Sequence, residues 1–258
     1  MCGELTADEQ EAATKYALED LFAGKAPVPS ASEASPHAVF TIGPPGSGKS
    51  TVADALVRAM GVHPAESYVV LDYDALIKYH PRFRDTWRVP DVFGRPTGVG
   101  YALGWMRCID DLDDLGQVLR KKIFTERYNV IVQTHAHTGL VEAQLAGYFV
   151  TLLYVGVPLA LAQDRARKRA VETGRFLAPT LEIQDRHIAQ TWERYKLQAP
   201  WYGLWADNVF VARNDRDGAP PDTRDDFAFI NPHEAWPGSL VKMMAAIAAA
   251  HDEGADRA

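Results

Sequence analysis

The segment that most constrains the fold is residues 43–50, which read Gly-Pro-Pro-Gly-Ser-Gly-Lys-Ser. They match the phosphate-loop pattern G-x-x-x-x-G-K-S/T. An apolar run at 38–42 leads into the loop and a helical pattern at 51–60 leads out of it, a context that an isolated glycine-rich turn lacks. Glycines let backbone N–H groups turn around an anion, and the following helix adds the positive end of its dipole. The sequence therefore predicts a strand, a phosphate-binding loop and a helix in succession.

The loop predicts a bound nucleoside triphosphate, ATP with Mg²⁺. Lys49 is expected to bridge the β and γ phosphates, and Ser50 is expected to hold the metal through its hydroxyl. The residues expected to contact the nucleotide are Gly43, Gly46, Ser47, Gly48, Lys49, Ser50 and Thr51.

Apolar runs rich in Val, Ile, Tyr and Phe recur along the chain, separated by stretches of helical character. The expected strands are residues 38–42, 68–71, 129–132, 149–155 and 208–211. Strands that alternate with helices favour a parallel sheet with helices on both faces. We therefore expect a single α/β domain with the P-loop NTPase kinase fold over residues 1–258, built on five parallel strands.

The other segments are expected to surround this sheet. Residues 1–36 combine a helix at 8–24 with a linker at 27–36 that is rich in Pro, Ser and Ala. Residues 80–120 are irregular at first and helical from 102 to 120, which suits a substrate-binding insertion. A helix at 233–250 and a charged tail to 258 end the chain, and we expect them to contribute packing only.

Composition excludes several classes of function. The formal net charge is -7, and no cluster of Lys and Arg suits long nucleic acid or a lipid surface. No run of 18 apolar residues is present, so no membrane span is expected. The two cysteines, Cys2 and Cys108, are expected to form neither a metal-ligand pair nor a disulfide framework. We therefore expect a soluble, cytoplasmic protein.

Two carboxylates favour a kinase over a nucleotide-hydrolysing switch or motor. The sequence contains neither the Asn-Lys-x-Asp segment of GTPases nor the Leu-Ser-Gly-Gly-Gln segment of ABC-type ATPases. Asp72 and Asp74 instead follow the second expected strand, at the end where open α/β sheets bind ligands. A carboxylate there can accept the proton of an acceptor hydroxyl or hold Mg²⁺ through water.

A basic run predicts an arginine lid at roughly 164–180. Arg165 and Arg169 are one helical turn apart, and Arg175 follows them. Guanidinium groups so placed can stabilise a transferring phosphoryl group. The alternative is a solvated basic helix face, which such runs usually form.

These features together resemble the zeta toxin family of kinases, over about residues 8–215. The shared elements, in order, are the N-terminal helix and linker, the phosphate loop, Val70-Leu71-Asp72-Tyr73-Asp74 followed by His80-Pro81, the strand Tyr128-Asn129-Val130-Ile131-Val132, Val157-Pro158 and the lid arginines. The aspartate pair followed by His-Pro is the most specific of them.

The resemblance implies roles for individual residues. Asp74 falls on the catalytic base of the family, and Lys49, Arg169 and Arg175 fall on groups that stabilise the transferring phosphoryl. Characterised members phosphorylate the 3′-hydroxyl of the amino sugar in UDP-N-acetylglucosamine, and some are toxins that an antitoxin protein holds inactive. An antitoxin is therefore a candidate partner.

The sequence departs from the family pattern where the acceptor is expected to bind. Gln133 stands in place of an acid at the end of the third strand, with His135 and His137 close behind, and Gln117 stands in place of another acid. The residues expected to bind the acceptor are Asp72, His80, Gln117, Gln133 and His135. Asp72 is also expected to serve Mg²⁺ together with Ser50, or to orient its loop. His135 and His137 fit either a different acceptor or a metal, and His137 equally fits a water-facing strand end.

The expected reaction is ATP-dependent phosphorylation of a hydroxyl on a nucleotide-sugar, a nucleotide or a related metabolite. The alternatives are a phosphotransferase that acts on NAD or an antibiotic, and a nucleotide-binding regulator without an acceptor.

Overall fold

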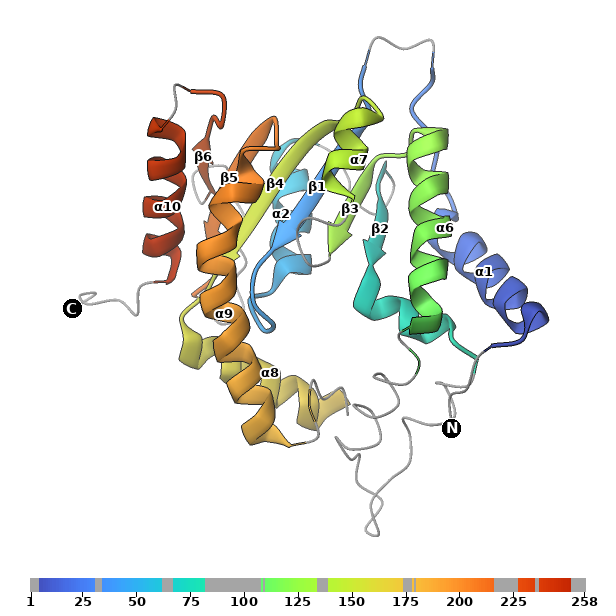
Figure 1. The fold of residues 1–258 in the computed structure, drawn as a ribbon, viewed down its shortest axis with the longest axis horizontal. Helices are drawn as coiled ribbons and strands as arrows, with labels where there is room; N and C mark the ends of the chain where they lie inside the picture. The colour runs from blue at the N-terminus through green and yellow to red at the C-terminus, as the bar shows by residue number, and fades with distance from the viewer. Residues whose placement is uncertain are drawn as a thin grey trace.

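A mostly parallel sheet forms the centre of the protein (Figure 1). The computed structural model describes residues 5–30, 34–61, 67–81, 108, 110–133, 139–173, 178, 180–215, 227–234 and 237–251. Within these ranges the sheet has six strands in the order β2-β3-β1-β4-β5-β6. The strands are β1 (His37–Ile42), β2 (Val69–Asp72), β3 (Val130–Gln133), β4 (Phe149–Gly156), β5 (Asn208–Arg213) and β6 (Phe227–Ile230).

All five strands expected from the sequence are present and pair in parallel. The expected count of five strands is wrong, because β6 pairs antiparallel with β5 at one edge of the sheet. Only four residues long, β6 follows a polar stretch at 216–226 whose sequence carries no alternating pattern. Strand β6 is defined by its pairing with β5 across this stretch, and such a pairing leaves little local signal in the sequence.

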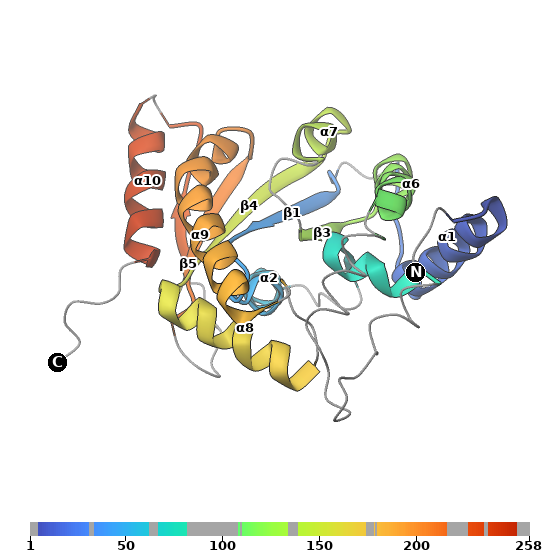
Figure 2. The same cartoon turned by 60° about the horizontal axis from the view of Figure 1, so that its bottom comes forward.

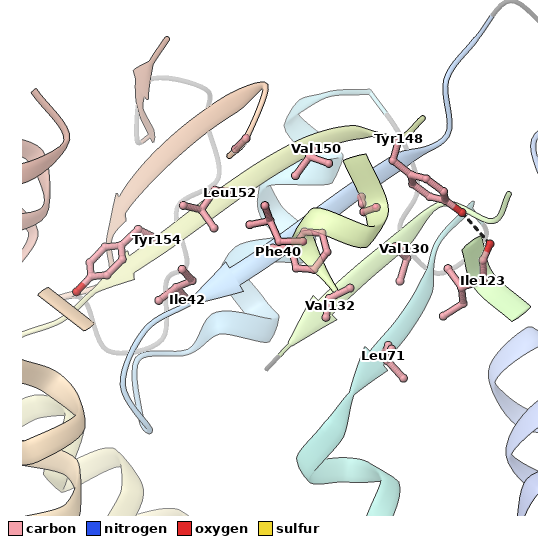
Figure 3. Close-up of a cluster of buried hydrophobic side chains, with 14 of the residues drawn as sticks. Phe40, Ile42, Leu71, Ile123, Val130, Val132, Tyr148, Val150, Leu152 and Tyr154 are labelled. Carbon is pink, nitrogen blue, oxygen red and sulfur yellow. Dashed lines mark hydrogen bonds between the residues drawn. The ribbon is translucent and has the colours of Figure 1, made fainter. Parts of the chain in front are cut away.

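Successive residues of the central strands pack against opposite layers. Along β1, Phe40 and Ile42 belong to one apolar cluster, whereas Val39 belongs to the other. Figure 3 shows the first cluster, where Val150, Leu152 and other side chains project from several strands toward the same layer. Burial on both faces explains why these strands are continuously apolar rather than alternating.

The helices cover both faces of the sheet. Their bounds are α1 (Ala7–Phe22), α2 (Lys49–Ala59), η1 (a 3-10 helix, Tyr73–Tyr79), α6 (Asp110–Glu126), α7 (Leu140–Leu145), α8 (Leu159–Thr173), α9 (Leu181–Gly203) and α10 (Gly238–His251). Residues of α6, α7, α9 and α10 pack in the first cluster, and residues of α2 pack in the second. Figure 2 separates these layers, with α6 and α7 above the strands and α2 below them.

Several expected helix boundaries shift in the structure. The expected helix at 102–120 lies partly outside the described residues, and α6 continues to Glu126. The expected lid at 164–180 begins inside α8, which starts earlier at Leu159. The C-terminal helix starts at Gly238 rather than at residue 233, directly after Pro237.

None of the helices in the described ranges is long and apolar enough to cross a membrane. Cys108 is buried and disulfide-bonded, contrary to the expectation for the cysteines.

The N-terminal helix is tied to the segment that follows β2. Asp20 of α1 accepts hydrogen bonds from Lys78 Nζ at 2.8 Å and from the Tyr79 hydroxyl at 2.6 Å. These hydrogen bonds lower the pKa of the Asp20 carboxyl, and the bond from Lys78 contributes most to the shift. The Tyr16 ring also meets the Tyr79 ring edge to face, with centroids 5.5 Å apart. Helix α1 therefore supports η1, which carries Asp74.

A buried histidine fastens the C-terminal helix to the sheet. His251 Nδ1 lies 3.1 Å from the Val157 carbonyl oxygen, so this nitrogen carries the proton and donates it. Nε2 is then the acceptor for the Tyr154 hydroxyl. Burial lowers the pKa of His251 to about 4, from an ordinary value of 6.5. The folded protein thus keeps this imidazole neutral at pH values where the unfolded chain protonates it.

We expect acid to destabilise the protein partly through His251. As the pH falls, the unfolded chain binds this proton first, so the contribution of neutral His251 is complete above about pH 6.5 and is lost toward about pH 4. The loss is at most about 3 kcal/mol, since the pKa falls from 6.5 to about 4 and one pKa unit corresponds to about 1.4 kcal/mol. Chemical denaturation at several pH values should show a shallower acid slope for His251→Gln than for the wild type.

The His251→Gln variant should keep part of the acid slope because of His37, whose pKa burial also lowers to about 4. The matched control is His233→Gln at an exposed position, which should leave the slope unchanged. Equal slopes for His251→Gln and the wild type would contradict the assignment.

Candidate active site

The phosphate loop joins the end of β1 to the start of α2 and lies in close backbone contact with its surroundings. Gly46 and Gly48 have φ angles of 82° and 78°, in the left-handed region that favours glycine. A Cβ atom at Gly46 would overlap the carbonyl oxygen of Ala162 in α8, and one at Gly48 would overlap the Asn214 side chain. These two positions therefore require glycine for both conformation and space.

The polar side chains of the loop point to a phosphate site. Lys49 Nζ donates hydrogen bonds to the carbonyl oxygens of Gly43 at 2.9 Å and Pro44 at 3.2 Å, so its ammonium lies over the loop. Ser47 is buried, whereas Ser50 and Thr51 are exposed in the first turn of α2. The loop and the positive end of α2 thus adjoin each other, an arrangement that suits a polyphosphate.

Gln133 lies beside Ser50 on the nucleotide side of the sheet. The Ser50 hydroxyl donates a hydrogen bond to Gln133 Oε1 over 2.7 Å. Gln133 is 9% exposed, and it pairs in register with Thr41 on β1 and with Asp72 on β2. Alternation along the strands puts Asp72 and Gln133 on the face that α2 covers.

These donors fit a magnesium ion that arrives with a nucleotide. Mg²⁺ takes oxygen ligands and is usually held by one or two carboxylates together with substrate phosphates and water. The hydroxyl of Ser50, the amide oxygen of Gln133 and the carboxylate of Asp72 are oxygen donors at one edge of the sheet. They would hold the ion next to the loop.

Asp72 and Asp74 occupy different environments at the end of β2. Asp72 Oδ1 accepts hydrogen bonds from the backbone N–H groups of Asp74 at 3.0 Å and Ala75 at 3.3 Å, so it caps η1. Asp74 is exposed in the first turn of η1. Burial raises the pKa of Tyr195 in α9 to about 12, and the nearby Asp74 carboxylate adds to this shift. Asp72 therefore orients the turn, and Asp74 is available to a ligand.

His80 ends this segment in the interior. Its side chain is completely buried, and its backbone N–H donates to the Ile77 carbonyl oxygen at 3.1 Å. An acceptor arriving from solvent does not reach such a side chain without movement of its surroundings.

The basic residues of α8 divide into two groups. Arg165 and Arg169 are half-buried on one side of the helix, whereas Arg167 and Lys168 are exposed. Arg165 Nη1 donates to the Asn214 carbonyl oxygen at 2.9 Å, and Arg167 pairs with Asp185 of α9. The helix thus presents Arg165 and Arg169 together, as the sequence predicts. Arg175, His135 and His137 lie outside the described residues.

Gln117 lines a groove of about 560 Å³ that is formed by residues of α6 together with Glu142 of α7. The groove is lined by Asp114, Gln117, Val118, Arg120, Lys121, Phe124, Thr125 and Glu142. Arg120 pairs with Glu142 of α7 at 2.7 Å and donates to the Tyr73 hydroxyl at 3.0 Å. Gly116 leaves room for the Tyr73 ring, which a Cβ at that position would overlap. Gln117 and Gln133, which sequence reasoning grouped together, therefore lie in different surroundings.

Sequence reasoning missed Asn214, which contacts the phosphate loop directly. Its Nδ2 donates to the Ser47 carbonyl oxygen at 2.7 Å. Asn214 follows a strand that the sequence does reveal, but no local pattern connects it to a loop more than 160 residues earlier. The sequence signal that could have identified Asn214 is its position directly after a parallel strand, because ligands of such sheets bind at the carboxyl ends of the strands.

Comparisons with known proteins agree with this geometry. The family model described as Zeta toxin matches residues 20–217. The chain belongs to the zeta toxin family. The family and its P-loop fold are those of an ATP-dependent, kinase-like phosphotransferase that works with a divalent metal.

Two solved structures have a similar fold. A chain of the PezAT chromosomal toxin-antitoxin system of Streptococcus pneumoniae is similar with a TM-score of 0.62 and 14% identity, over 99% of this chain and 92% of that chain. A chain of AvrRxo1-ORF1:-ORF2 with ATP is similar with a TM-score of 0.54 and 10% identity, over 95% of this chain and 83% of that chain. A search of curated protein sequences gives no significant match.

We expect Lys49→Ala to lower ATP affinity by tenfold or more and to abolish phosphoryl transfer. Charge-assisted hydrogen bonds contribute about 1.5 to 3 kcal/mol, and about 1.4 kcal/mol corresponds to a factor of ten. Calorimetric titration with ATP and Mg²⁺ measures the loss. Lys242→Ala, an exposed lysine of α10 that pairs with Glu234, is the control and should bind as the wild type does. Unchanged affinity in a folded Lys49 variant would contradict the nucleotide site.

Proposed function

We propose that this zeta-toxin-family protein transfers the γ-phosphoryl group of ATP to a hydroxyl of a nucleotide-sugar, a nucleotide or a related metabolite. The observation that supports this most directly is the exposed Asp74, held by the Asp72 cap at the carboxyl ends of the parallel strands, where the phosphate loop also begins. A nucleotide on one side and a free carboxylate on the other is the arrangement that phosphoryl transfer to a hydroxyl requires.

The proposed roles follow from these positions. Asp74 accepts the proton of the acceptor hydroxyl while the hydroxyl oxygen forms its bond to the γ phosphorus. The bond from that phosphorus to the β–γ bridging oxygen breaks, and ADP leaves. Lys49, Arg169 and Arg175 stabilise charge on the phosphoryl oxygens. Mg²⁺, when bound near Ser50 and Asp72, neutralises charge on the phosphates.

The acceptor side is proposed to differ from that of family members that use UDP-N-acetylglucosamine. Gln117 and Gln133 are neutral where the family carries acids. An amide makes weaker hydrogen bonds to sugar hydroxyls than a carboxylate, and it also offers donors to carbonyl or phosphate oxygens. Gln117 lines the groove beside α6, and His135 is proposed to contact the acceptor as well. Gln133 contacts Ser50, so we assign it first to the metal side and only through that contact to the acceptor.

Two alternative functions are each supported by part of the same site. An NAD or antibiotic phosphotransferase shares the loop, the base and the lid arginines, and differs only in the acceptor. A nucleotide-binding regulator shares the loop alone. An antitoxin partner is proposed from the family, and PezAT is itself a toxin-antitoxin system. Incubating a metabolite extract with ATP and the protein, followed by mass spectrometry, separates these functions, because a kinase adds a phosphoryl mass to one metabolite and a regulator to none.

We expect Asp74→Asn to lower the transfer rate by about 100-fold or more, the usual scale for loss of a general base, and to leave ATP binding nearly intact. Asp72→Asn is the matched comparison. Its amide oxygen still caps η1, so its effect should appear mainly in the dependence on Mg²⁺. Full activity of the Asp74 variant together with a loss in the Asp72 variant would place the base on the other carboxylate.

We expect UDP-N-acetylglucosamine to be a poor substrate for the wild type. The weakened hydrogen bond at Gln117 should lower its affinity by about tenfold, at about 1.4 kcal/mol per factor of ten, and Gln133 should add to the loss only through its contact with Ser50. Turnover should improve in the Gln117→Glu, Gln133→Glu double variant. Of the single variants, Gln117→Glu should change the KM for the acceptor, and Gln133→Glu should change the Mg²⁺ dependence. Efficient wild-type turnover that no variant improves would contradict this expectation and assign UDP-N-acetylglucosamine as the acceptor.

A further inference from the structure

Asn214 lies where three parts of the candidate site meet. It follows the last residue of β5 and is 8% exposed. Its backbone N–H donates to the Gly156 carbonyl oxygen at the end of β4 over 2.9 Å. Its carbonyl oxygen accepts from Arg165 of α8 at 2.9 Å, and its side chain donates to the Ser47 carbonyl oxygen at 2.7 Å. One residue therefore contacts the sheet edge, the arginine helix and the phosphate loop.

The contact with the loop falls at the turn that shapes the anion cradle. Ser47 precedes Gly48, which has a φ of 78° and directly precedes the first residue of α2. The Asn214 amide packs so closely on Gly48 that a Cβ there would overlap it. Ser47 is fully buried, and its carbonyl oxygen accepts the hydrogen bond of the Asn214 amide. A smaller side chain at position 214 would leave this oxygen without that donor. The orientation of the Gly48 and Lys49 N–H groups depends on this turn.

We infer that Asn214 is a positioning residue that holds the phosphate loop in its anion-binding conformation and couples it to the arginine helix α8. The side chain fixes the Ser47–Gly48 turn, and the backbone fixes Arg165 in the same place. Movement of α8 is then transmitted to the loop through Asn214, in addition to the direct contact between Ala162 and Gly46. The consequence for catalysis rests on the proposed function, whereas the consequence for nucleotide binding does not.

An asparagine suits this position for two reasons. It supplies an uncharged N–H donor, whereas an aspartate of the same shape would direct a carboxylate at the Ser47 carbonyl oxygen. It is also short, which the close contact with Gly48 requires. A leucine has a similar size and lacks the donor, so it tests the hydrogen bond without adding charge.

The experiment measures ATP affinity by calorimetry for Asn214→Ala and Asn214→Leu, at a temperature where circular dichroism shows each variant folded. We expect both to weaken ATP binding by tenfold or more. The matched control is Asn129→Ala, which removes another hydrogen bond between an asparagine side chain and the backbone, in which the His37 N–H donates to Asn129 Oδ1 over 2.8 Å. That bond lies at the start of β1, at the opposite edge of the sheet from the loop, so ATP affinity should stay within twofold of the wild type.

A second measurement tests the coupling. Arg165→Ala should also weaken ATP binding, and the double variant with Asn214→Ala should lose less than the product of the two single effects, because both changes loosen the same turn. Wild-type ATP affinity in either folded Asn214 variant, or an equal loss in Asn129→Ala, would overturn the positioning role. Independent effects of the two residues would overturn the coupling. Failure of the wild type to phosphorylate any acceptor would refute the kinase proposal and leave these binding comparisons intact.

Discussion

The constraint on which the rest of the structure depends is the position of β1 between β3 and β4, with apolar side chains packed on both of its faces. A strand so enclosed cannot shift its register without moving a buried side chain to the wrong layer. Its last residue, Ile42, is therefore fixed, and so is the point where the phosphate loop begins. The chain moves to opposite sides of β1 when it forms β2 and β4, which opens the crevice where sheets of this type bind ligands.

The proposed nucleotide side and the proposed acceptor side of the site are supported by different elements. Residues 43–50 rest on α8 and on Asn214, at the end of β5. Asp74 rests on η1, which α1 supports through Asp20 and which α6 supports through Arg120 and Tyr73. The two sets meet at neighbouring strand ends, where Asp72 pairs with Gln133 and Gln133 contacts Ser50.

Local patterns were enough to predict the parts of the fold that carry strong local signals. The five parallel strands are continuous apolar runs, and the loop glycines are required by backbone conformation, so both could be read from the sequence. Strand β6, the burial of His80 and the disulfide of Cys108 depend on distant partners that no local pattern specifies. Gln133 was assigned to the acceptor from its place in the family pattern. Its contact with Ser50 became visible only when β3 and α2 were placed side by side.

The ties between α1 and η1 separate the surroundings of Asp74 from the central strands. Helix α1 contacts η1, β2 and α6 at the margin of the sheet and contributes only Ala17 to the fully buried core. Substitutions in this margin can reshape the neighbourhood of Asp74 at little cost to the packing that fixes the phosphate loop. Under the proposed function, substitutions in α1, η1 and α6 therefore alter the acceptor side with less effect on the phosphate loop than substitutions in the central strands.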